Sequence, residues 1–163
     1  MSESHNSLVC VIHSPMEGTV YPLENVPDPG FSKRIIGDGV AIVPSEPTVY
    51  TPLDGKVVSV FETKHAIVFE NEQKFRILLH VGIGSMRLQG RGFETFVKNG
   101  QEVKKGDKLL SVDLEYLDES ADALASPIVL ENRKGRYEVA VVAKGHIKVG
   151  EPLFEIYEVD ETI

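Results

Sequence analysis

The sequence predicts an all-β protein, a compact antiparallel β-sandwich or barrel with a few short helices. Residues that favour turns recur every eight to twelve positions or so, a spacing typical of short strands joined by tight turns. The segments between these turns are rich in Val, Ile, Leu and Thr, as in residues 56–61 and 137–142. Helical periodicity is weak, so only short helices are expected, over residues 29–36, 92–97 and 114–124.

The size and charge of the chain predict one domain with protein partners. A chain of 163 residues is long enough for one sizeable core, because a domain near that length buries roughly 70% of its unfolded surface. We place the domain at residues 8–163, after a polar and flexible tail at residues 1–7. The net charge of −8 argues against nucleic acid and anionic membrane surfaces as partners, and it suits a basic protein surface.

Cysteine use and hydropathy predict a cytoplasmic protein. Cys10 is the only cysteine, so an intramolecular disulfide is excluded, and its apolar neighbours predict a buried, inert thiol. No apolar stretch reaches about 18 residues, the length that crosses a bilayer. The polar start of the chain lacks the basic region that opens a signal peptide. We therefore expect no insertion into a membrane.

Two short patterns occur twice along the chain. Residues 14–20 read Ser-Pro-Met-Glu-Gly-Thr-Val, and residues 51–57 read Thr-Pro-Leu-Asp-Gly-Lys-Val. A glycine-containing turn at residues 100–109 resembles residues 145–153, with one deletion. Together the pairs indicate two related halves packed face to face. The alternative is that such turns recur by chance, because Pro, Gly and acidic residues are common in the turns of β proteins.

Two histidines lie fifteen positions apart on a predicted β-hairpin, whose two apolar runs flank a polar loop at residues 71–74. If the loop is symmetric about Glu72 and Gln73, His65 faces His80 across the hairpin. Directly opposed residues have Cβ atoms roughly 4.5–5.5 Å apart, so the two imidazoles could bind one phosphoryl group or one metal ion together. A slip of one residue would put one histidine on the other face of the sheet.

Six segments follow one another in a characteristic order, at residues 14–18, 26–31, 37–42, 63–66, 78–83 and 88–93. In order and spacing they resemble the glucose-type IIA component of the bacterial phosphoenolpyruvate-dependent sugar phosphotransferase system. The resemblance continues through residues 100–109 and 126–129. It implies a β-sandwich of the duplicated hybrid type. It also implies a cytoplasmic phosphocarrier, which takes phosphate on a histidine from the carrier protein HPr and hands it to the IIB domain of a sugar permease.

By motif match, the resemblance places the phosphorylated histidine at His80 and the supporting histidine at His65. Thr63 matches a family threonine that hydrogen-bonds within the site, where it would hold the tautomer of His65. Phosphoryl transfer needs such positioned donors, because charge spreads over the equatorial oxygens of the transferred group. No nucleotide-binding loop with a Lys-Ser/Thr end is present, so we expect a protein to supply the phosphate, without ATP or a cofactor.

The resemblance also implies a docking surface. Asp38 matches a family aspartate that meets a basic residue of the partner, although Gly-Asp-Gly is also ordinary turn chemistry. Three apolar residues would either surround the pocket or belong to the core: Phe31, Val40 and Ile42. The chain departs from the family at Gly84, where an aspartate is usual. This departure predicts weaker docking of a standard donor, and a gain in kcat/KM for the Gly84→Asp variant.

Three other functions stay open on the sequence. His65, His80 and Asp38 could form a three-ligand zinc site in a metallopeptidase, although the His-x-His pair of such enzymes is missing. The turn at residues 100–109 resembles those of biotinyl and lipoyl carriers, but no Met-Lys-Met sequence is present. A regulator that binds other proteins according to its phosphorylation state would use the same carrier chemistry.

Overall fold

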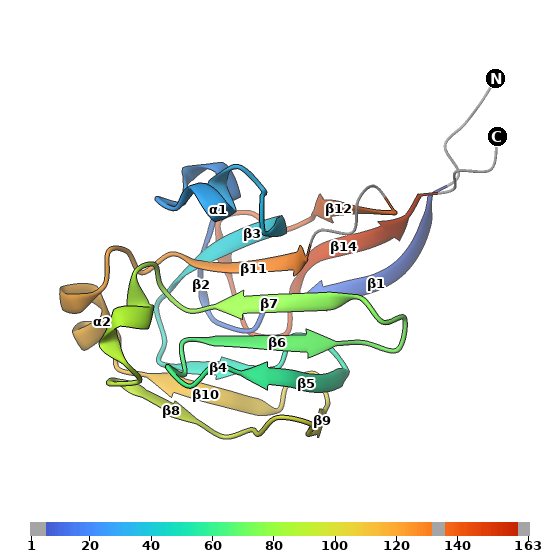
Figure 1. Ribbon diagram of the computed structural model, residues 1–163. Coiled ribbons are helices and arrows are strands. Elements are labelled where there is room, and N and C mark those ends of the chain that lie inside the picture. Colours follow the sequence, from blue (N-terminus) through green and yellow to red (C-terminus); the bar gives the residue numbers. More distant parts are fainter. Residues whose placement is uncertain (1–5, 132–135, 160–163) are drawn as a thin grey trace.

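The computed structural model describes residues 6–131 and 136–159, and in these residues strands form three antiparallel sheets (Figure 1). This confirms the predicted all-β class. Most of the predicted flexible tail lies outside the described residues, whereas its last residue, Ser7, already begins strand β1 (Ser7–His13). No helix in the described part of the chain is long and apolar enough to cross a membrane.

The largest sheet has eight strands in the order β13-β2-β3-β11-β7-β6-β5-β9. These strands are β13 (His146–Ile147), β2 (Gly18–Tyr21), β3 (Gly37–Pro44), β11 (Ser126–Glu131), β7 (Arg76–His80), β6 (Ala66–Glu70), β5 (Gly55–Val60) and β9 (Glu102–Val103). Two smaller sheets have the orders β1-β14-β12 and β4-β10-β8. Their other strands are β14 (Pro152–Glu158), β12 (Tyr137–Val141), β4 (Thr48–Tyr50), β10 (Lys108–Val112) and β8 (Phe93–Thr95). The predicted histidine hairpin, β6 and β7, therefore lies inside the largest sheet.

Two short α-helices lie where the sequence predicts them, and a third prediction is wrong. α1 spans Pro29–Ser32 and α2 spans Leu114–Ser120. Each begins after an aspartate whose carboxylate accepts a hydrogen bond from the first turn, Asp28 for α1 and Asp113 for α2. Residues 92–97 contain strand β8 instead, because this segment pairs with β10. The sequence does not predict the two 3-10 helices, η1 (Leu23–Asn25) and η2 (Ser85–Leu88).

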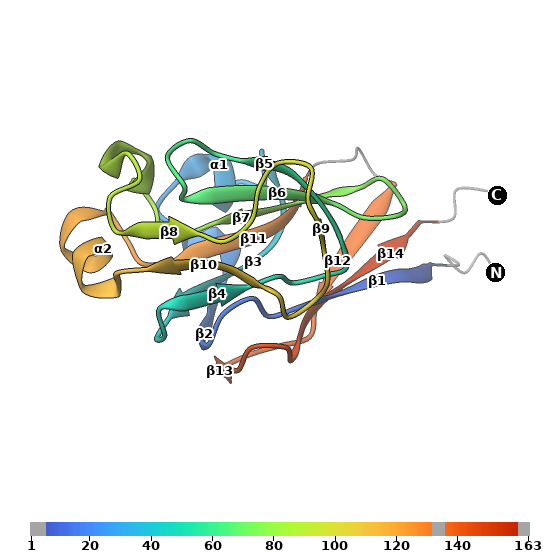
Figure 2. The same cartoon turned by 90° about the horizontal axis from the view of Figure 1, so that it is seen from below.

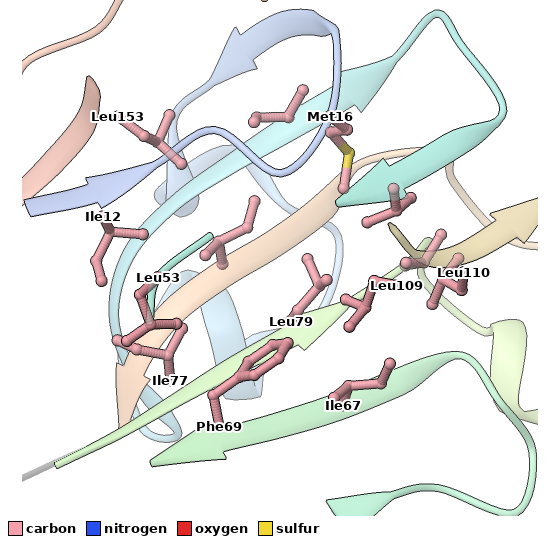
Figure 3. Packing of buried hydrophobic residues seen from close by; sticks show 14 of the residues in the cluster. Ile12, Met16, Leu53, Ile67, Phe69, Ile77, Leu79, Leu109, Leu110 and Leu153 are labelled. Carbon is pink, nitrogen blue, oxygen red and sulfur yellow. The ribbon is translucent and has the colours of Figure 1, made fainter. Parts of the chain in front are cut away.

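The main hydrophobic core lies between the largest sheet and the two smaller ones. In the view from below, the sheet β4-β10-β8 lies in front of the largest sheet (Figure 2). Figure 3 shows alternate residues of β6 and β7 facing this core: Ile67, Phe69, Ile77 and Leu79. The smaller sheets contribute Ile12 of β1, Leu109 of β10 and Leu153 of β14. Because side chains alternate between the faces of a strand, the remaining residues of β6 and β7 face the other way.

A second, smaller hydrophobic cluster covers that other face of the largest sheet. It includes Ala66 and Val68 of β6 and Leu78 of β7, which alternate with the residues of the main core. Phe31 of α1 packs over this cluster and is buried, and α1 lies next to β3 in Figure 1. His80, the last residue of β7, belongs to this second face by alternation.

The repeated sequence patterns make equivalent hydrogen bonds, which supports the predicted internal duplication. The N–H of Ser14 donates to the carbonyl of Glu151, and the N–H of Thr51 donates to the carbonyl of Asp107, both at 2.8 Å. The two turns also bond to each other, through His13 N to Pro52 O at 3.0 Å and Tyr50 N to Pro15 O at 2.7 Å. Equivalent residues of the two patterns therefore make equivalent backbone hydrogen bonds.

The order of the largest sheet shows the same duplication. Its strands β13-β2-β3-β11 on one side correspond to β9-β5-β6-β7 on the other. β2 and β5 each begin inside a copy of the first pattern, and β13 and β9 each lie inside a copy of the second. The two halves therefore lie side by side and share one sheet, where the sequence suggests a face-to-face packing.

Candidate active site

The hairpin of β6 and β7 has a register one residue away from the predicted one. Ala66 lies opposite His80, in the place where the sequence predicts His65. The backbone of residues 71 and 75 is hydrogen-bonded, so the loop has three residues, 72–74, and Lys74 is left-handed with a φ of 68°. Three-residue loops that end in a left-handed residue are common in hairpins, and an odd loop length moves the register by one position.

His65 nevertheless reaches His80. It precedes the first residue of β6, and Lys64 before it has a φ of 61°. His65 therefore lies outside the regular strand, so alternation along β6 does not decide which way its side chain points. The two imidazole rings meet edge to face with centroids 4.7 Å apart. The carbonyl of His65 still extends the ladder, because it accepts a 2.8 Å hydrogen bond from Val81 N. The rings are paired as predicted, by a different backbone path.

One ring nitrogen of His80 is held by the backbone. His80 Nδ1 lies 2.8 Å from the carbonyl oxygen of Gly82, to which it donates. Gly82 has a φ of 76°, a left-handed conformation that turns the chain back toward the ring and that glycine adopts without strain. Its N–H donates in turn to Ser126 Oγ at 3.0 Å. With the proton on Nδ1, His80 Nε2 carries the lone pair, which makes it the nucleophilic atom of a neutral imidazole.

The ring of His65 is fixed in a similar way. Thr63 Oγ1 lies 2.8 Å from His65 Nδ1, so the threonine and the histidine are in contact as predicted. Phe61 packs edge to face on the same ring with centroids 5.7 Å apart, and His65 is only 2% exposed. When the Thr63 hydroxyl donates to Nδ1, the proton of the neutral ring is on Nε2, which can then donate to a bound group.

Both imidazoles are neutral at pH 7. Burial and the neighbouring His80 lower the pKa of His65 to about 4, against the opposing effect of a hydrogen bond with the backbone of Thr63. Burial also lowers the pKa of His80, although the Gly82 hydrogen bond and the charge of Asp28 act in the other direction. A neutral His80 keeps the lone pair on Nε2, so this atom can act as a nucleophile.

The two histidines line a pocket of about 380 Å³ with mainly apolar walls. The other lining residues are Asp28, Phe31, Ile36, Phe61, Leu78, Gly84 and Met86. Three of these also expose apolar surface: Ile36 is 36% exposed, Phe61 38% and Met86 61%. An apolar surface with few charges around a pocket fits the centre of a protein–protein interface.

Sequence reasoning does not find several of these pocket residues. Phe61, Ile36 and Met86 lie outside the regular strands, where apolar periodicity gives no signal. Asp28 has a recognisable signal for a structural role only, because an aspartate before the Pro29 of a helix start is typical of an N-cap. Its electrostatic effect on His80 depends on the folded position of α1.

Asp38 is the second residue of β3 and lies outside the pocket, so it does not form the turn considered as the alternative. Asp38 is aligned with Leu130 of β11, which is aligned in turn with Ile77 of β7. Asp38 is therefore two strands away from β7, at the level of a residue three positions before His80. With about 4.8 Å between strands and 3.3 Å per residue, the Cα atoms of Asp38 and His80 are about 14 Å apart. The Asp38 carboxylate accepts a hydrogen bond from Arg34 Nε at 2.9 Å.

Of the three apolar residues predicted around the pocket, only Phe31 reaches it. Its ring meets His80 edge to face with centroids 5.1 Å apart. Val40 and Ile42 are buried in the main core. Val40 is aligned across β11 with Leu79, which faces the core, whereas His80 faces the opposite side of the sheet. Their burial contradicts partner contact by Val40 and Ile42, and their role is that of core residues.

Gly84 lines the pocket in a left-handed conformation with a φ of 73°. A Cβ atom added there would overlap the Asp122 carboxylate at Oδ2 and Cγ. Backbone strain and this overlap both oppose a side chain at the position. The expected gain of the Gly84→Asp variant therefore conflicts with the structure, because the new carboxylate would have to displace one that is already present.

The three zinc ligands of the metallopeptidase alternative do not come together. His65 and His80 are in contact, but Asp38 is bonded to Arg34 outside the pocket. Across residues 6–131 and 136–159, no group of three or more His, Cys, Asp or Glu side chains is placed to hold a metal ion.

The fold matches a solved structure over nearly the whole chain. Glucose permease IIA from Mycoplasma capricolum has a TM-score of 0.83 to this protein and 35% sequence identity, over 95% of this chain and 96% of that one. The duplicated antiparallel fold is therefore that of a IIA domain.

Sequence comparison gives the family. The family model of the phosphoenolpyruvate-dependent sugar phosphotransferase system, EIIA 1, matches residues 10–136. The glucose-specific EIIA component of Oceanobacillus iheyensis is 41% identical over 138 residues, which are 85% of this chain and 84% of that protein. The N-acetylglucosamine-specific EIICBA component of Escherichia coli is 39% identical over 144 residues, 88% of this chain and 22% of that protein. The chain belongs to the EIIA 1 family of the sugar phosphotransferase system.

Proposed function

We propose that this protein is a phosphocarrier, which accepts a phosphoryl group from phospho-HPr on His80 Nε2 and passes it to the IIB domain of a sugar permease. The observation that carries the proposal is the hydrogen bond from His80 Nδ1 to Gly82, which leaves Nε2 as a nucleophile beside a second imidazole. The names of the relatives support a role in sugar uptake, with glucose or N-acetylglucosamine as the sugar. The name EIICBA also pairs an A part with a B part in one protein.

In the first transfer, the lone pair of neutral His80 Nε2 attacks the phosphorus of phospho-HPr. The P–Nε2 bond forms while the bond between phosphorus and HPr breaks, and HPr keeps the electron pair of the broken bond. Positive charge develops on the imidazole as Nε2 bonds to phosphorus, and the Gly82 carbonyl stabilises it at the Nδ1 proton. In the second transfer, a nucleophile of the IIB domain attacks the phosphorus and His80 leaves with its lone pair.

His65 supports the transfer by donating from Nε2 to an oxygen of the phosphoryl group. Negative charge spreads over the three equatorial oxygens in the loose transition state, so a donor fixed beside His80 stabilises it. Thr63 is a positioning residue, because its hydroxyl holds the proton of His65 on Nε2. The low pKa of His65, about 4, keeps the ring neutral and so leaves the phosphoryl charge for a cation of the partner to neutralise.

The partner docks on the apolar surface around the pocket and on Asp38. Ile36, Phe61 and Met86 expose apolar surface there, and their contact with a partner would exclude water from the transferring group. Asp38 already shares its carboxylate with Arg34 and can accept a basic residue of HPr in addition. A carboxylate at the edge of an apolar contact favours the approach of a basic partner.

Phosphate transfer to the purified protein tests this proposal. The protein is incubated with phosphoenolpyruvate, enzyme I and HPr, and the product is mapped by mass spectrometry at alkaline pH, which preserves phosphohistidine. We expect one phosphate, on His80. The His80→Gln variant should lose at least about 10³-fold in uptake rate, because the nucleophile is gone.

His146→Gln is the matched control. His146 is exposed on β13, where its Nε2 lies 2.9 Å from Glu17, so this variant also loses one imidazole while the pocket stays intact. It should take up phosphate at the wild-type rate. Label on a residue other than His80, or normal labelling of His80→Gln, would overturn the proposal.

A further inference from the structure

The backbone places Asp122 at the edge of the pocket. Asp122 follows α2, and Gly84 follows β7, so the two are far apart in sequence. An antiparallel bridge between Ile83 and Ala123 joins these two loops. Its hydrogen bonds run from Ile83 N to Ala123 O at 2.9 Å and from Asp122 N to Ile83 O at 2.8 Å. The Asp122 carboxylate thereby lies where a side chain of Gly84 would begin.

Arg87 fixes this carboxylate through one of its two oxygens. Arg87 Nη2 donates to Asp122 Oδ1 at 2.8 Å and to the carbonyl of Ser120 at 3.1 Å. Within residues 6–131 and 136–159, no group donates a hydrogen bond to Asp122 Oδ2, the oxygen that faces Gly84. The hydrogen bond and charge of Arg87 hold the pKa of Asp122 below its usual value, so the carboxylate stays ionised. Asp122 is thus an oriented anion with one oxygen available, and its side chain is 56% exposed.

We infer that Asp122 is a docking contact for an arginine or lysine side chain of the protein that exchanges phosphate with His80. The inference rests on the proposed function. Gly84 lines the same pocket as His80, so a cation bound at Asp122 Oδ2 would lie beside the transferring group. Gly84 leaves room for the Asp122–Arg87 ion pair, since an added Cβ atom would overlap Asp122 Oδ2 and lie 2.9 Å from Arg87 Nη1.

Asp122 and Asp38 then form a pair of docking carboxylates with the pocket between them. Asp38 lies on β3, two strands away from β7, and Asp122 lies beyond the end of β7, next to α2. Each carboxylate is held by an arginine of this chain, Arg34 or Arg87, through one oxygen. Two separated anions around an apolar pocket select a partner with two cations at matching spacing, which sets orientation as well as attraction.

A conservative variant tests the contact. Asp122→Asn removes the charge and keeps the shape, and we expect the KM for phospho-HPr to rise about tenfold at low ionic strength, with kcat nearly unchanged. The increase should shrink as salt is added, because a partly exposed ion pair is screened. Asp118→Asn is the control, since Asp118 is an exposed aspartate of α2 that does not contact Gly84. It should change KM less than twofold.

A charge swap separates docking from a purely structural role. The double variant Arg87→Asp with Asp122→Arg keeps an ion pair between the two loops, so its thermal midpoint should stay near the wild-type value. It exchanges the positions of the anion and the cation beside Gly84, and we expect an increase in KM of about tenfold or more. An unchanged KM in the swap or in Asp122→Asn, or an equal change in Asp118→Asn, would overturn the inference. If HPr does not label His80 of the wild type at all, the proposed function fails instead, so the two failures are distinct.

Discussion

The half of the molecule around β2, β3 and β11 and the half around β5, β6 and β7 use equivalent strand pairings for different purposes. Val129 lies opposite Gly39 in the first half, and His80 lies opposite Ala66 in the second. β11 and β7 are equivalent strands of the two halves, and they pair with each other at Ile128 and Leu79. Val129 follows Ile128 and His80 follows Leu79, so Val129 and His80 occupy equivalent positions. One is a buried valine and the other is the candidate nucleophile.

The difference comes from the segment that precedes the second strand of each half. In the first half the chain from Tyr21 to Gly37 contains η1 and α1, which cover Val129 as part of the second hydrophobic cluster. In the second half only residues 61–65 separate β5 from β6. The short connection leaves His80 accessible, while Phe31 from the longer one supplies a wall of the pocket. Duplication therefore gives the scaffold, and unequal loops give one half its chemistry.

Acidification should give the largest effect on stability, because only one half of the molecule contains the paired histidines. His65 has a pKa of about 4 in the folded protein against an ordinary 6.5, so the unfolded chain binds more protons between these values. The contribution of His65 to the free energy of unfolding should be highest above about pH 6.5, fall as the pH drops toward 4, and level off below. The loss from His65 alone is about 3 kcal/mol. The lowered pKa of His80 acts in the same direction.

Urea unfolding at pH 7.5, 5.5 and 4.5 measures this loss. The double variant His65→Gln, His80→Gln should lose less stability on acidification than the wild type, and the difference between the two curves isolates the histidines from the carboxylates. His146→Gln should follow the wild type. Parallel curves for the wild type and the double variant would mean that the acid sensitivity comes from elsewhere.

A histidine placed in the other half should not create a second site. Val129→His puts an imidazole at the position equivalent to His80, but the residue is fully buried under the segment that contains α1. We expect a loss of about 2 kcal/mol in the free energy of unfolding, since a buried ring without partners loses its hydration. Val129→Ala controls for the lost packing.

Labelling by phospho-HPr gives the functional side of the same test. In a His80→Gln background, Val129→His should restore no uptake, because the partner cannot reach the ring and no second imidazole adjoins it. Phosphate on the introduced imidazole would show that the scaffold alone provides the chemistry.

The fold could be predicted in large part because its signals are local. Turn residues and β-rich segments give the all-β class, and the copied patterns around Ser14 and Thr51 give the duplication. The helix predicted over residues 92–97 is wrong because the pairing of β8 with β10 is not local. The predicted hairpin register is wrong by one residue because a left-handed Lys74 gives no sequence signal of the kind that glycine would give.

The site could be predicted only in part, for a related reason. His65 and His80 are separated by one hairpin, so hairpin topology brings them together even though the register differs. Phe31 is expected at the pocket only through the family resemblance, whereas Asp28 comes from the same loop of the other half and Asp122 from beyond α2. Their proximity to the histidines depends on how the two halves share one sheet, which no short segment of sequence encodes.

Thr63 should matter only in the half that carries the histidines. Thr63→Val keeps the shape of the side chain and removes the hydroxyl beside His65 Nδ1, so the ring can take the wrong tautomer. We expect uptake from phospho-HPr to slow about tenfold, a loss of about 1.4 kcal/mol of transition-state stabilisation. Thr63→Ser should recover most of the rate, which a purely structural role of the methyl group would not allow. Stopped-flow or quench-flow labelling measures both variants.

The smallest effects should be equal in the two halves. Ser14 Oγ donates to the carbonyl of Met16 at 2.7 Å, and Thr51 Oγ1 donates to the carbonyl of Asp107 at 3.1 Å, and both side chains are buried. Ser14→Ala and Thr51→Val should each lower the free energy of unfolding by about 1 kcal/mol, because each removes one buried hydrogen bond of the scaffold. Both should take up phosphate at the wild-type rate, since neither turn touches the pocket. If Thr51→Val slowed uptake and Ser14→Ala did not, the turn around Thr51 would belong to the site. The two turns would then not be equivalent scaffold elements, which would contradict the comparison of the two halves.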